Sequence, residues 1–136
     1  MGAPDAYAGE LPVVFATLVP GQRASEAELL AFTAERVDEA PAKPKSVTVI
    51  EHMPMTNVGK IYKSELRAMA AGQVAAALVE AVCAELGVAP EARPRVLSDE
   101  QRGVVVQLDA QAPPQVRARL QSALAPLPVK TQVLAA

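Results

Sequence analysis

Apolar residues in the first third of the chain follow two different spacings. Residues 13–19 are apolar on both alternating faces and end at a Pro-Gly pair, which is typical of a strand covered on both sides. We therefore expect a central strand at 13–19. The run Ser-Glu-Ala-Glu from Ser25 fits a helix capping box, and the apolar residues after it recur at helical spacing, so a helix is predicted at 25–37. The apolar run 47–50 predicts another strand.

A longer helical pattern occupies the middle of the chain. Residues 64–67 are expected to begin a helical turn, and past Gly72 a second, longer helix is predicted. Gly87 is its natural end, because glycine is favoured just past the last helical turn. The apolar stripe of this helix repeats every four residues and consists of Val74, Leu78, Val82 and Leu86.

The pattern changes beyond Pro90. Strands are predicted at 95–97, 103–108 and 130–134, and a pair of prolines starts a helix between the last two. This order describes a small β-β-α-β lobe, which we expect to pack on the first half or on a missing partner. The predicted fold class is α+β, divided into a domain at 1–71 and a helix plus lobe at 72–136.

Composition excludes several classes of protein. The chain has 136 residues, a net charge of -2 and 51% hydrophobic residues, which is typical of a globular protein and disfavours nucleic acid as a partner. A single cysteine, Cys83, cannot form an internal disulfide, so a cytoplasmic location is expected. The nearest candidate for a membrane span, the alanine-rich stretch 74–82, is shorter than the roughly 20 residues that cross a bilayer, so no transmembrane segment is expected.

The most informative stretch is residues 54–67, which place Lys60 on a glycine-punctuated turn between an apolar strand and a helix. An ammonium is a compact charge on a flexible stem, and Gly59 permits backbone conformations that a branched residue would block. A lysine in this position can hold a phosphate and a carboxylate together while they react. Lys60 is therefore the first candidate for catalysis.

These residues resemble a known family. The ordered set from Gly2-Ala3-Pro4-Asp5 with Gly9-Glu10, through Pro44-Lys45-Ser46-Val47, to Thr56-Asn57-Val58-Gly59-Lys60-Ile61 is similar to the C-terminal domain of AMP-forming acyl-CoA synthetases. The resemblance runs from the first residues to about Arg67, roughly half of the chain. It implies a small mixed sheet with packed helices. A lone Gly-Lys-Ile would carry little weight, whereas the whole set in order is specific.

The resemblance also implies a function. It makes Lys60 the adenylation lysine and places Thr56 and Gly59 next to the substrate or nucleotide. The reaction would convert a carboxylic acid, expected to be a fatty acid, to acyl-AMP and then acyl-CoA, with ATP, Mg²⁺ and CoA bound in the full enzyme. A large N-terminal adenylating domain is the implied partner. The isolated chain is expected to be inactive and to bind none of these cofactors by itself.

Two departures from the family pattern leave alternatives open. The hinge and first elements of the family domain would lie upstream of Met1, so we expect a fragment in which the strand at 13–19 has an open edge. The tail after about Gly72 is longer than usual and indicates a subgroup with an extra lobe. The open strand edge or the tail could support a homo-oligomer. The rival interpretation is a non-catalytic interaction module. A third is regulatory, because acetylation of Lys60 would remove its charge.

The other polar residues have simpler interpretations. His52 is the only histidine, so no metal site is predicted, and it is expected on the surface. Cys83 is expected to pack in a core rather than to act as a nucleophile. The two acidic pairs, Asp5 with Glu10 and Asp99 with Glu100, are expected in turns. A solvated role is preferred over a CoA contact for Lys43, Lys45, Lys63 and Arg67.

Overall fold

A computed structural model describes residues 1–135 of the chain. Its first part contains two small two-stranded sheets. Strands β1 (Gly2–Asp5) and β2 (Gly9–Pro12) form an antiparallel hairpin, and β3 (Val14–Ala16) pairs in parallel with β4 (Val47–Val49). Between β3 and β4 lie helix α1 (Glu26–Arg36) and the 3-10 turn η1 (Ala40–Ala42). The capping box is confirmed at its first half, because the Ser25 hydroxyl accepts a hydrogen bond of 3.0 Å from the Glu28 amide.

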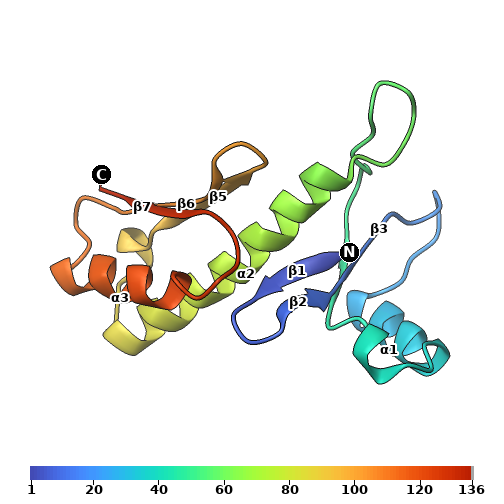
Figure 1. Cartoon of the computed structure of the whole chain (residues 1–136), viewed down its shortest axis with the longest axis horizontal. Helices are drawn as coiled ribbons and strands as arrows, with labels where there is room; N and C mark the ends of the chain where they lie inside the picture. The colour runs from blue at the N-terminus through green and yellow to red at the C-terminus, as the bar shows by residue number, and fades with distance from the viewer. Residues whose placement is uncertain (136) are drawn as a thin grey trace.

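Helix α2 (Lys63–Leu86) is the axis of the molecule. Figure 1 shows the β1–β2 hairpin beside α2, with β3 and α1 farther to the right and the last part of the chain to the left. The helix ends as predicted at Gly87, which adopts the left-handed conformation with φ of 67°. Its buried residues are Leu66, Ala70, Ala71, Ala75, Val79, Val82 and Cys83.

The last part of the chain forms the predicted β-β-α-β unit, preceded by the 3-10 turn η2 (Pro90–Ala92). We call this unit the C-terminal lobe. It consists of strands β5 (Arg95–Asp99), β6 (Gly103–Gln107) and β7 (Thr131–Leu134), with helix α3 (Pro114–Leu124) between β6 and β7. Strand β6 is central, antiparallel to β5 and parallel to β7.

The main core lies between α2 and the C-terminal lobe, where Val104, Val106, Val116 and Leu120 are completely buried. A much smaller cluster joins Ala3 and Val13 to Ala70 of α2. The predicted fold class, α+β, is thus confirmed, with three small sheets in place of one mixed sheet.

Two predictions about elements are wrong in detail. The strand expected at 13–19 is reduced to β3, because β4 offers only three pairing residues and the chain beyond Ala16 has no partner strand in the part that the structure describes. The helix expected to start beyond Gly72 is continuous with the turn at 64–67. The proposed boundary between 71 and 72 therefore falls inside one helix.

Length and composition alone would allow α2 to cross a membrane, since the mean hydropathy of its most apolar window is 1.5. This is weak evidence, because core helices of soluble proteins pass the same test. About a third of that window is buried against the rest of the chain.

Candidate functional site

Lys60 lies on a tight hairpin just before α2, which we call the lysine loop (residues 55–61). Met55 and Ile61 form its closing antiparallel bridge. The amide of Thr56 donates to the carbonyl of Lys60 at 2.7 Å, and the amide of Gly59 donates back to the carbonyl of Thr56 at 3.0 Å. Gly59 has φ of +81°, a conformation that costs other residues roughly 1–2 kcal/mol. The glycine is therefore required by the shape of the loop.

The side chain of Thr56 has a defined part in this shape. Its hydroxyl oxygen accepts a hydrogen bond of 3.1 Å from the amide of Lys60. The backbone on both sides of the lysine is thus held by residue 56, once through its main chain and once through its side chain. Contact of Thr56 or Gly59 with a substrate stays a prediction.

Lys60 itself is exposed, and its ammonium makes no ion pair with any residue in the range 1–135. The apolar residues around it are also exposed, with Val58 at 80%, Met55 at 52% and Ile61 at 49%. Figure 1 shows the loop projecting beyond the first turn of α2, away from the C-terminal lobe. The side chain of Lys60 is consequently accessible from outside the described chain.

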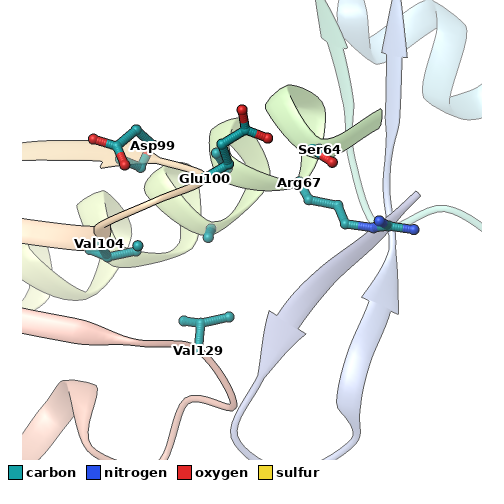
Figure 2. Close-up of a pocket in the computed structure, with 10 residues that line it drawn as sticks. Ser64, Arg67, Asp99, Glu100, Val104 and Val129 are labelled. Atoms are coloured by element: carbon teal, nitrogen blue, oxygen red, sulfur yellow. The ribbon is translucent and has the colours of Figure 1, made fainter. Parts of the chain in front are cut away.

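A separate pocket of about 320 Å³ lies where α2 meets the C-terminal lobe. Figure 2 shows Asp99 at the end of β5, Glu100 beside it at the start of the β5–β6 turn, and Arg67 reaching from α2 toward the strands of the first part. The lining of the pocket also includes small apolar residues of α2 and β6. Lys60 does not line this pocket, so the lysine loop and the pocket are distinct places on the surface.

The acidic residues of the β5–β6 turn have clear structural roles. The Asp99 carboxylate accepts from the amides of Arg102 at 2.5 Å and Gln101 at 2.9 Å, and these bonds lower the pKa of Asp99. Glu100 accepts a hydrogen bond from the hydroxyl of Tyr62, which raises the pKa of that phenol. Sequence reasoning missed this pair, because the two residues are 38 positions apart and neither belongs to a motif.

The remaining candidates agree with their simpler interpretations. Cys83 is completely buried, and this burial raises the pKa of its thiol and keeps it neutral. His52 is exposed. Asp5 accepts from the amides of Tyr7 and Ala8 in the β1–β2 turn. Across residues 1–135, no three His, Cys, Asp or Glu side chains come together as metal ligands would.

Comparison with known proteins places the lysine in a family context. Residues 1–60 match the AMP-binding enzyme C-terminal domain, and Lys60 is the last residue of the match. This part of the chain is therefore similar to the C-terminal domain of AMP-binding enzymes, which agrees with the resemblance to AMP-forming acyl-CoA synthetases. The rest of the chain, including the C-terminal lobe, lies outside the match.

Three relatives illustrate the similarity. The chain is 42% identical over 67 residues to a marinolic acid–CoA ligase of Pseudoalteromonas sp. (strain SANK 73390), covering 49% of this chain and 10% of the relative. It is 41% identical over 66 residues to a long-chain-fatty-acid–CoA ligase of Bacillus subtilis (strain 168), covering 48% and 11%. It is 36% identical over 73 residues to an acetyl-coenzyme A synthetase of Deinococcus radiodurans, covering 54% and 11%. The chain thus spans about a tenth of the length of these relatives.

Proposed function

We propose that this chain supplies the adenylation lysine, Lys60, of an AMP-forming acyl-CoA synthetase whose N-terminal domain binds ATP and a carboxylic acid. The observation that carries the proposal is the presentation of Lys60. It stands on a hydrogen-bonded loop, exposed and without an ionic partner in the described chain, at the end of the segment that matches the family. The names of the relatives extend from acetyl-CoA to long-chain acyl-CoA synthesis, and a fatty acid is the acyl donor we propose.

The chemistry explains why a cation is needed there. A carboxylate oxygen attacks the α-phosphorus of ATP, the bond to the β-phosphate breaks, and pyrophosphate leaves with the bonding electrons. Two anions must approach each other, and negative charge spreads over the phosphoryl oxygens in the transition state. An ammonium between them stabilises this charge. The thiol of CoA then attacks the acyl carbon and releases AMP.

The same proposal predicts that the isolated chain is inactive. The lysine loop projects from the fold and is exposed, so it needs a complementary surface to exclude water from the reacting groups. Its exposed apolar residues Met55, Val58 and Ile61 support such a docked state, since they would be covered on closure. Mg²⁺ would accompany ATP in the other domain, because residues 1–135 offer no cluster of metal ligands. We also propose a cytoplasmic location for the whole enzyme.

The test is ATP–pyrophosphate exchange with this chain joined to an N-terminal adenylating domain, assayed over acids from acetate to long-chain fatty acids. Lys60→Ala should lower the exchange rate by about a thousandfold, the usual effect of losing one well-placed electrostatic group. Lys130→Ala is the matched control, since Lys130 is also exposed and lies outside the lysine loop. Unchanged exchange in Lys60→Ala would overturn the proposal.

A further inference from the structure

We propose that the C-terminal lobe positions the lysine loop through the contact between Tyr62 and Glu100. The inference rests on the proposed function, because it concerns the orientation of the same Lys60. It assigns a role to residues outside the family match, and it makes Tyr62 and Glu100 positioning residues rather than catalytic ones.

Tyr62 stands at the joint between the lysine loop and α2. It follows Ile61, the last residue of the closing bridge, and its amide donates to the carbonyl of Pro54 at 2.8 Å on the opposite side of the loop. It is also the residue that precedes the first turn of α2, and no side chain caps the helix there. Tyr62 is therefore the residue about which the lysine loop would rotate relative to α2.

Glu100 is held on the other side of this joint by the lobe. Its turn is fixed by the two amides that donate to Asp99, and β5 leads into the turn directly from its contact with α2. Gly72 of α2 allows this contact, since a side-chain carbon at that position would collide with the hydroxyl of Ser98. Figure 2 shows Glu100 at the end of the turn, beside α2.

Within the described residues, the Tyr62–Glu100 bond adds a side-chain hydrogen bond to the C-terminal lobe beside the two backbone stems of the lysine loop. A loop on two stems can pivot, whereas a contact at the joint restricts the pivot. Small changes in the position of a catalytic group affect the rate, because a displacement of about 1 Å can lower it on the order of a hundredfold. The lobe can therefore affect adenylation without touching a substrate.

The kinetic test uses the same two-domain enzyme as the test of Lys60. Tyr62→Phe and Glu100→Ala should each lower the rate of adenylation about tenfold at saturating ATP, with KM for ATP changed less than about twofold. The double variant should be no slower than either single variant, because both remove one contact. Glu100→Gln should recover most of the rate, since an amide oxygen still accepts from the phenol. Tyr7→Phe and Glu91→Ala are matched controls at exposed sites.

A second measurement needs no activity. In the chain alone, Tyr62→Phe and Glu100→Ala should speed hydrogen exchange at the amides of Thr56 and Lys60, while amides in the core of α3 keep wild-type rates. Wild-type rates of both adenylation and exchange in these variants would overturn the positioning role. If Lys60→Ala leaves adenylation intact, the proposed function fails instead, and the exchange data still report whether the contact restrains the loop.

Discussion

At the scale of single residues, this chain keeps its polar chemistry on the surface. No polar or charged residue in the described range is buried, and the polar contacts that shape the lysine loop and the β5–β6 turn are exposed. Exposed contacts contribute little to overall stability because water competes for the same groups. Their effect is instead local: they select one geometry of a turn. For Lys60 this local geometry is what matters, since its proposed partners lie outside the chain.

The Tyr62–Glu100 contact predicts a pH effect. Mainly through its hydrogen bond to Glu100, the folded chain raises the pKa of Tyr62 above the ordinary value of about 10. The contact therefore stabilises the fold fully below pH of about 10, and this stabilisation is lost as pH rises through the higher folded pKa. The chain has two tyrosines and no tryptophan, so in Tyr7→Phe the ultraviolet absorbance of tyrosinate reports Tyr62 alone.

Adding Glu100→Ala to Tyr7→Phe should lower the measured pKa of Tyr62 toward that of a free tyrosine. Adding Glu91→Ala should leave it unchanged, because Glu91 lies in η2 and is not among the groups that shift Tyr62. Equal titration curves for the two double variants would show that the contact does not persist in solution.

Local backbone geometry was predictable where it belongs to a short motif. The stretch around Lys60 indicated a turn, and the left-handed Gly59 follows from the requirement for a tight turn, whereas the catalytic role of Lys60 stays a prediction. Tyr62 and Glu100 were not predictable, because their meeting depends on how the C-terminal lobe packs against α2. No periodicity in one sequence encodes a pairing of exposed residues at such a separation.

At the scale of elements, α2 determines the architecture. It contacts β1, β5, β6 and α3, so it belongs to both halves of the chain. A hydrogen bond of 3.1 Å from Gln73 to Thr48 adds a link to the strand β4. Capping and termination signals predicted α1 and the end of α2 well. Gly72 misled the prediction of a helix start, since helix propensity treats glycine as a breaker, whereas here it makes room for Ser98.

This close approach predicts coupling between Gly72 and Ser98. In an exposed helix, Gly→Ala stabilises by about 1 kcal/mol, but at position 72 the new carbon would meet the side chain of Ser98. Gly72→Ala should therefore give no net gain or a loss in the wild-type background. In the Ser98→Ala background, where the hydroxyl is absent, the same change should be more favourable by about 1 kcal/mol.

The coupling is measured by a double-mutant cycle, in which urea unfolding gives the free energy of unfolding of the wild type, Gly72→Ala, Ser98→Ala and the double variant. The control cycle pairs Gly72→Ala with Ser122→Ala, which removes the same hydroxyl group from an exposed position of α3. The free energies of these two changes should add, because distant sites without shared partners act independently. If the free energies also add in the Gly72–Ser98 cycle, Ser98 of β5 does not contact α2 closely at Gly72.

At the scale of the whole molecule, the core is distributed unevenly. Of 19 buried apolar residues in the described range, only Ala3, Val13 and Val47 precede α2. The alternation of strand and helix patterns predicted the elements on both sides, but it did not reveal that nearly all burial belongs to α2 and the C-terminal lobe. That information lies in packing between distant elements. Truncation after Arg67 would consequently remove the core along with the lobe, so point variants are the cleaner way to separate catalysis from self-association.

The uneven core leads to a prediction about folding. Residues 63–136 should fold without the preceding segment, because they retain the whole cluster between α2 and the C-terminal lobe. Residues 1–62 should not fold alone, because they lose Ala70 and the helix surface against which β1 packs. Circular dichroism with urea titration should show a cooperative transition for the longer peptide and none for the shorter. Leu120→Ala in the longer peptide, at a completely buried position, should cost about 2–5 kcal/mol and so distinguish a packed lobe from an isolated helix. A cooperative transition in residues 1–62 would instead mean that this segment, which includes the family match, is stable without α2 and the C-terminal lobe.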